Sequence, residues 1–145
     1  MFKIFKKKND YNIYSPVNGK TISLENVPDK VFASKMMGEG IGFEFSGDTV
    51  YAPCNGKIIL VANTLHAIGI AADCGVEILI HIGLDTVNLN GKGFKKLISQ
   101  NDTIKKGQPL IKIDRQFMEK EQINMITPMV ITNSDDYTID RTCWG

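Results

Sequence analysis

The sequence predicts an all-β protein, an antiparallel β-barrel or sandwich with a few short helical turns. Short apolar runs rich in β-branched residues alternate with turns of Gly, Pro, Asn and Asp, which is typical of antiparallel sheets. A heptapeptide also recurs, as YSPVNGK at residues 14–20 and as YAPCNGK at residues 51–57. Each copy contains Asn-Gly, which predicts a tight turn with positive φ followed by a strand. We therefore expect two similar hairpin units. A chain of 145 residues also has the usual length of a single domain, so we expect both units to lie in one domain.

The individual elements follow from the same patterns, taken in order along the chain. Strands are expected at residues 41–45, 57–62, 67–72, 76–82 and 109–113, and a polar turn, NDTIKKG, precedes the last of them. Asp114 is placed to cap a helix over residues 115–122. Short helical turns are expected at 29–37 and 93–98. The domain is expected to span residues 13–134, between a basic flexible tail at 1–12 and a C-terminal tail at 135–145.

Composition and charge exclude several classes of function. The formal net charge is +1, so no nucleic-acid partner is expected. No apolar run is long enough to span a membrane, and the lysine-rich residues 1–10 lack the apolar stretch of a signal peptide. At most, this tail contacts a membrane surface peripherally. Three cysteines without metal-type spacing indicate reduced thiols, and hence a cytoplasmic protein.

The chain has only two histidines, His66 and His81, on either side of a turn at Asp73 and Cys74. If these two turn residues form a two-residue hairpin loop, His66 faces His81 directly across the strands. A three-residue loop shifts the register and sends the two rings to opposite faces. We favour the first register because it gives the two histidines a joint role.

Three kinds of chemistry are open to such a pair. A zinc site would need further ligands, and an acid/base pair could serve hydrolysis. Alternatively, one neutral imidazole attacks phosphorus while the second imidazole and Thr64 donate hydrogen bonds to the phosphoryl group. In that case the backbone of Gly83 could fix the ring of His81 by accepting from its other nitrogen.

The motif around the second histidine is HIGLDTV at residues 81–87, with GVEILI before it and TLHA at residues 64–67. NGKGF and KKGQPL follow, and SPVNGK, VPDKVFA and YAPCNGK lie upstream. Together these motifs resemble the glucose-type enzyme IIA domain of the bacterial phosphoenolpyruvate-dependent sugar phosphotransferase system, over roughly residues 13–134.

The resemblance implies a β-barrel sandwich that carries a phosphoryl group from the carrier protein HPr to a cysteine of a permease IIB domain. His81 is the implied acceptor through Nε2, and His66 is implied to stabilise the phosphoryl group with Thr64 orienting it. No cofactor and no metal are expected. A regulatory module that binds proteins through the same face without turnover is the alternative.

The resemblance also implies a docking surface for these partners. Two acidic residues, Asp29 and Asp85, match positions that meet arginines of partner proteins. The matching apolar rim consists of Val31, Phe32, Met36, Met37, Leu79 and Val87. On this interpretation Phe32 and the methionine pair belong to the interface rather than to the core.

Two features depart from the family pattern. The match ends near residue 134, and the segment DDYTIDRTCWG has no recognised counterpart. The loss of a final strand would expose a sheet edge. Lys35, beside the methionine pair, resembles a biotinyl-lysine site, but the flanking methionine pattern does not fit. The short segment before residue 13 favours a free-standing protein.

Overall fold

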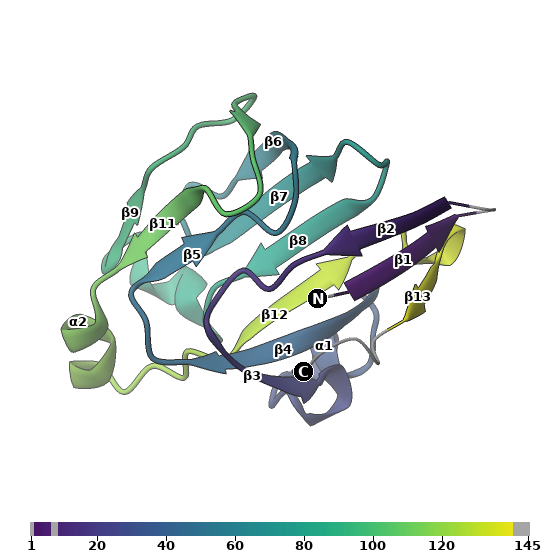
Figure 1. Cartoon of the computed structure of the whole chain (residues 1–145). Helices are drawn as coiled ribbons and strands as arrows, with labels where there is room; N and C mark the ends of the chain where they lie inside the picture. Colours follow the sequence, from purple (N-terminus) through teal and green to yellow (C-terminus); the bar gives the residue numbers. More distant parts are fainter. Residues whose placement is uncertain (1, 7–8, 141–145) are drawn as a thin grey trace.

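The computed structural model describes residues 2–6 and 9–140, and in them the chain forms a mostly β structure of antiparallel strands (Figure 1). The predicted fold class is confirmed. The strands are β1 (Phe2–Lys6), β2 (Asn9–Ile13), β3 (Gly19–Ser23), β4 (Glu39–Phe45), β5 (Thr49–Tyr51), β6 (Gly56–Val61), β7 (Ala67–Ala72), β8 (Glu77–His81), β9 (Phe94–Lys96), β10 (Thr103–Ile104), β11 (Pro109–Ile113), β12 (Thr127–Ile131) and β13 (Thr138–Asp140). The helices are η1 (Leu24–Asn26), α1 (Lys30–Ala33), η2 (Thr86–Leu89), α2 (Arg115–Lys120) and η3 (Ser134–Asp136).

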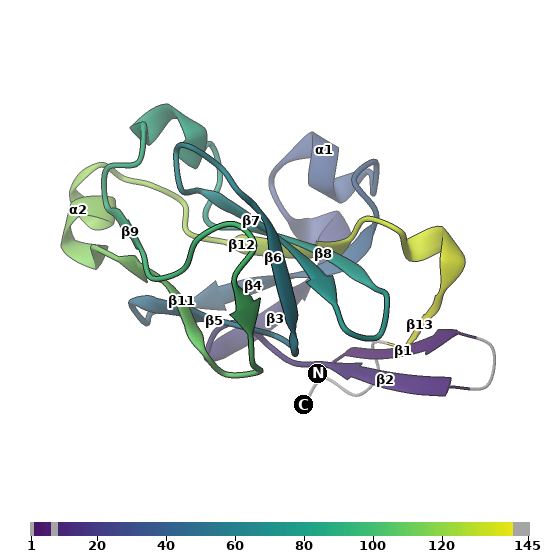
Figure 2. The same ribbon diagram turned by 90° about the horizontal axis from the view of Figure 1, so that it is seen from above.

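Two sheets enclose the main core. The larger has the order β10-β6-β7-β8-β12-β4-β3, and the smaller has the order β5-β11-β9. Alternate side chains of the large sheet, such as Ile68, Ile80 and Met129, are fully buried in this core with Ile111 of the small sheet. A second, smaller apolar cluster lies on the outer face of the large sheet under η1 and α1, and α1 lies away from β11 and β5 in Figure 2.

Most of the expected elements are present. Strands β7 and β11 have the predicted bounds, and β4, β6 and β8 differ from prediction by one or two residues at their ends. Asp114 caps α2 by accepting from the backbone N–H of Phe117 at 3.1 Å. The helical turn expected at 93–98 is wrong, because residues 94–96 form β9, which pairs with β11 and places Phe94 opposite Ile113.

The two heptapeptide copies do form similar units, and they bond to each other reciprocally. Tyr14 N–H donates to the carbonyl of Pro53, and Tyr51 N–H donates to that of Pro16, both at 2.8 Å. The expected positive φ at Asn-Gly is wrong, because neither of these two glycines has a positive φ. Instead each glycine lies against a neighbouring strand. A Cβ on Gly19 would lie 2.0 Å from the backbone oxygen of Glu44, and a Cβ on Gly56 would lie 2.4 Å from the backbone oxygen of Ala71.

The favoured hairpin register is also wrong. The loop between β7 and β8 has three residues, because Ala72 N–H donates to Val76 O at 2.9 Å and Gly75 takes φ +99°. A turn that closes through a left-handed residue is the usual three-residue hairpin. Ala67, and not His66, therefore lies opposite His81, and Gly69 lies opposite Leu79.

Both ends of the described chain take part in a third sheet, with the order β13-β1-β2 (Figure 1). Residues of the segment expected to be a flexible tail, 1–12, thus lie in β1 and β2, and β13 adds part of the C-terminal segment 135–145. Ile13, at the end of β2, is fully buried in the main core. Cys143 and Trp144 lie outside the described residues.

Candidate active site

His81 is the last residue of β8, and its ring is held from one side. Nδ1 lies 2.7 Å from the carbonyl oxygen of Gly83. A carbonyl only accepts, so Nδ1 carries the proton, and the neutral ring keeps its lone pair on Nε2. Gly83 has φ +74°, and a Cβ there would lie 2.7 Å from Cγ2 of Thr86. Glycine is therefore required where the chain turns back to present this carbonyl.

His66 lies just before β7, outside the regular strand. Leu65 has φ +59°, which turns the backbone out of the strand conformation immediately before His66. The His66 carbonyl still accepts from Ile82 N–H at 2.6 Å, so the histidine stays attached to the end of β8. The Thr64 hydroxyl lies 2.5 Å from Nδ1 of His66. When this hydroxyl donates, the proton of the neutral ring is on Nε2.

The two histidine rings meet although their strand positions do not oppose each other. The centroids of His66 and His81 are 4.9 Å apart, with the ring planes at 73°. On another side, the ring of Phe32 lies 5.0 Å from that of His81, with the planes at 62°. Both histidines are half-buried, so each has a shielded side and an accessible side.

Burial has the largest effect on the pKa of both histidines. It lowers the pKa of His66, and the proximity of His81 lowers this pKa further. Burial also lowers the pKa of His81, against the opposing effects of the Gly83 hydrogen bond and of Asp29 and Asp85. Both imidazoles are therefore favoured in the neutral form near pH 7, where a ring nitrogen can act as a nucleophile.

The structure brings the two predicted acidic residues to this site from different loops. Asp29 caps α1 by accepting from the backbone N–H of Val31 at 2.9 Å and of Phe32 at 3.3 Å. Asp85 follows β8 in a left-handed conformation, with φ +57°, and is exposed. Both carboxylates raise the pKa of His81, which indicates that both lie within electrostatic range of the ring.

The predicted apolar rim divides into exposed and buried members. Four are exposed: Val31, Met36, Met37 and Val87. Phe32 is only 5% exposed and belongs to the small cluster with Leu24 and Val130, so its assignment to the interface rather than to the core is wrong. Leu79 is partly buried against the same cluster.

A metal site and a cysteine nucleophile have less support in the geometry. No group of three or more His, Cys, Asp or Glu is arranged to hold a metal ion in the ranges 2–6 and 9–140. Cys54 is buried, which raises the pKa of its thiol to about 12. A thiol with such a pKa stays protonated near pH 7 and is a poor nucleophile.

Comparisons with known proteins show the fold and the family. The glucose permease IIA of Mycoplasma capricolum has a solved structure that is similar with a TM-score of 0.80 and 35% identity, over 84% of this chain and 79% of that one. The glucose-specific EIIA component of Staphylococcus epidermidis is 44% identical over 92% of this chain and 82% of its own length. The EIICBA component of Staphylococcus saprophyticus is 44% identical over 90% of this chain, which spans only 19% of that longer protein.

Fold and similarity together define a phosphocarrier domain of a sugar phosphotransferase system. The family model described as phosphoenolpyruvate-dependent sugar phosphotransferase system, EIIA 1, matches residues 11–137, and the chain belongs to this family. The match extends two residues before and three residues beyond the predicted domain. Within the described segments, no helix has the length and apolarity to cross a membrane.

Sequence reasoning missed one group of residues beside the site. Lys35 contacts Glu25 and Glu39, and this network borders the segment that carries Phe32. The spacing of Lys35 and Glu39, four residues apart, was an available signal. Nothing in the local sequence indicated that Glu25, ten residues earlier, would come within 2.6 Å of the same ammonium group.

Proposed function

We propose that this chain accepts a phosphoryl group on Nε2 of His81 from phosphorylated HPr and passes it to the cysteine of a permease IIB domain. The observation that carries the proposal is the hydrogen bond from Nδ1 of His81 to Gly83, because it leaves the Nε2 lone pair free. In the first step the P–N bond of the HPr phosphohistidine breaks as a P–N bond to His81 forms. In the second step this bond breaks as a thiolate sulfur binds the phosphorus.

His66 is suited to stabilise the phosphoryl group during its onward transfer from His81. With Thr64 donating to Nδ1, the Nε2–H of His66 can donate to a phosphoryl oxygen on the neighbouring ring. The transition state of phosphoryl transfer is loose, so positioning and charge stabilisation account for most of the catalysis. Neutral rings suit this division of roles, since His81 attacks through a lone pair and His66 donates a hydrogen bond.

The surroundings of the rings suit protein partners rather than a small enclosed substrate. Exposed apolar side chains mark docking surfaces, and methionine adapts to more than one partner. Asp29 and Asp85 add negative charge beside them, which complements basic residues on a carrier protein. Such partners belong to the cytoplasm, where we place this chain.

The carrier role is tied to no single sugar by similarity. Relatives with glucose-specific and glucoside-specific names are both 44% identical to the chain. Because the phosphoryl group travels between proteins, the sugar is recognised by the permease domains rather than by His81 or its rim.

The test is phosphorylation with phosphoenolpyruvate, enzyme I and HPr, followed by mass spectrometry of the intact chain. We expect one added phosphoryl group on the wild type and none on His81→Gln. Full labelling of that variant would show that another residue is the acceptor. A partner captured equally by the phosphorylated and unphosphorylated chain would instead support the regulatory binding module, which the exposed rim also favours.

A further inference from the structure

Lys35 ends the α1 segment in an unusual backbone conformation. Its φ is +63°, in the left-handed region that favours glycine. The turn itself is made by backbone groups: Lys35 N–H donates to Phe32 O at 3.0 Å, and Gly38 N–H donates to Lys35 O at 3.1 Å. Glycine would make the same turn with less strain. A lysine at this position therefore indicates a use for its side chain.

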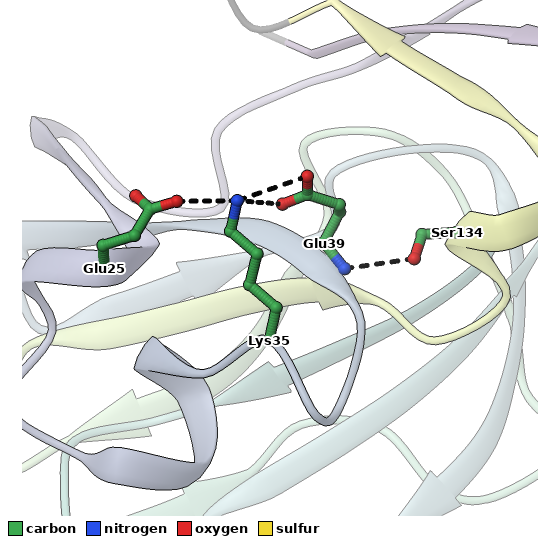
Figure 3. A network of polar contacts seen from close by, with 4 residues as sticks. All are labelled: Glu25, Lys35, Glu39 and Ser134. Atoms are coloured by element: carbon green, nitrogen blue, oxygen red, sulfur yellow. Dashed lines mark hydrogen bonds and ion pairs between the residues drawn. The ribbon is translucent and has the colours of Figure 1, made fainter.

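The ammonium group of Lys35 joins two carboxylates from different segments (Figure 3). Nζ lies 2.6 Å from Glu25 Oε1, in η1, and 3.2 Å from Glu39 Oε1, at the start of β4. Glu39 N–H in turn donates to Oγ of Ser134 in η3 at 3.1 Å. One cation thus connects the entry and the exit of the segment between Glu25 and Glu39.

The charges in this network are mutually stabilised. Hydrogen bonding to Lys35 is the largest of the effects that lower the pKa of Glu25 to about 2. Hydrogen bonds to Glu25 and then Glu39 raise the pKa of Lys35. Glu25 and Lys35 therefore both stay ionised around neutral pH. Isolated surface ion pairs contribute little, but a shared network of several charges is better able to order a loop.

The segment that this network closes carries two residues of the active site. Asp29 and Phe32 both lie between Glu25 and Glu39, and Phe32 packs its ring against His81 at 5.0 Å. Helix α1 has four residues, far fewer than the ~12–15 that make an isolated helix even marginally stable. Its placement over β8 therefore depends on tertiary contacts, which are the burial of Phe32 and the ion pairs that hold its two flanks.

We propose that Lys35 is a positioning residue: its ammonium group, bound to Glu25 and Glu39, keeps Phe32 against His81 and so sets the orientation of the acceptor ring. The proposal rests on the proposed role of His81 in phosphoryl transfer. Lys35 acts through Phe32, since it has no contact with either histidine in the described part of the chain.

A substitution at Lys35 should change the pKa of His81 by changing how deeply its ring is buried. The titratable groups near His81 are Asp29, on the flank of α1, Asp85 after β8, and His66 before β7. Loosening α1 withdraws both the cover of Phe32 and the charge of Asp29. Because burial is the largest effect on His81, we expect the pKa of His81 to rise toward its ordinary value.

The experiment replaces the side chain while keeping the turn. Lys35→Gly suits φ +63°, so the variant should fold with a thermal midpoint close to that of the wild type. We expect uptake from phosphorylated HPr to slow about tenfold, since misplacing a reacting group by 1 Å can cost about 10²-fold. The pKa of His81, followed by NMR of its ring, should rise in the free protein. Lys35→Arg should restore both values.

Two further variants keep the test decisive. Glu25→Ala leaves the turn at Lys35 untouched. It should also slow uptake and raise the pKa of His81. Lys112→Met removes a different exposed ion pair, at 3.6 Å from Asp48, and should change neither value.

Specific results would overturn the proposal. Uptake by Lys35→Gly within twofold of the wild type, with an unchanged His81 spectrum, would do so. Slow uptake with an unchanged His81 pKa would assign Lys35 to docking instead. If the wild type takes up no phosphoryl group, the proposed function fails, and the NMR comparison still decides whether Lys35 positions His81.

Discussion

The ring of His66 lies edge-on to the ring of His81, with the centroids 4.9 Å apart, although the two residues are not paired across the hairpin. The contact exists because Leu65 breaks the strand conformation with φ +59° immediately before His66. The geometry leads to five predictions in addition to the Lys35 experiment.

We expect His66→Gln to separate the two transfers. The variant keeps the nucleophile on His81 and should still accept a phosphoryl group. Loss of one well-placed donor typically slows a step by about 10²–10³-fold, so onward transfer to a IIB domain should be slow. Rapid-quench measurement of that transfer is the test, and a rate equal to that of the wild type would remove His66 from the mechanism.

Gly83→Ala, next to His81, should lower the stability of the fold more than Gly107→Ala. A Cβ at Gly83 meets Thr86 at 2.7 Å, whereas Gly107 has a similar φ of +83° with nothing within 4 Å. Both substitutions carry the cost of a left-handed alanine. Only Gly83→Ala adds overlap, which costs about 1–3 kcal/mol. Urea denaturation should show this difference, and equal losses would mean that the site relaxes around the methyl group.

Phe32→Ala and Met36→Ala should act on different properties. Phe32 is buried, and truncating a buried phenylalanine costs about 3–5 kcal/mol of stability. Met36 is 79% exposed, so its truncation should change stability by less than about 0.5 kcal/mol. Met36→Ala should instead weaken binding to HPr in a titration. A large loss of stability in Met36→Ala would contradict the division of the rim into buried and exposed members.

Acidification should destabilise the fold through the two histidines. Burial lowers the pKa of both rings, so below an unfolded value of about 6.5 the unfolded chain binds more protons than the folded one. Stability therefore falls as the pH drops through about 6.5, until each ring is protonated in the folded state. Denaturation of the double variant His66→Gln/His81→Gln should show a weaker dependence in this window. Identical curves would assign the effect to other groups.

In the single variant His81→Gln, the remaining ring offers a check on the same electrostatics. Proximity of His81 contributes to the lowered pKa of His66, so its removal should raise that pKa. NMR titration of the one remaining histidine measures this directly.

Much of the fold was predictable because its signals are local. Strands β7 and β11 and the cap of α2 by Asp114 depend on residues within a few positions of each other, and each was confirmed. The expected helical turn at 93–98 failed for the opposite reason. Residues 94–96 are a strand because Ile111 and Ile113 of β11 supply the pairing partners and the core, and these lie well over ten residues away.

In the heptapeptide, the sequence correctly indicated that glycine is needed, but the physical reason that we expected was wrong. Both glycines are needed where the sequence has them, but the reason is the approach of another strand rather than a positive φ. For Gly19 that strand is β4, and for Gly56 it is β7. Only the assembled sheet supplies the backbone oxygen that excludes a side chain.

The sequence by itself determined the fold class, the small number of histidines and the motif that links the chain to its family, since composition and short spacings carry these. The tertiary structure decided how the site is built. It placed His66 beside His81 through a loop of three residues and a left-handed Leu65, buried Phe32, and brought Glu25 to Lys35. Such contacts depend on the register of sheets and the packing of distant segments. Neither can be recognised from a short stretch of sequence.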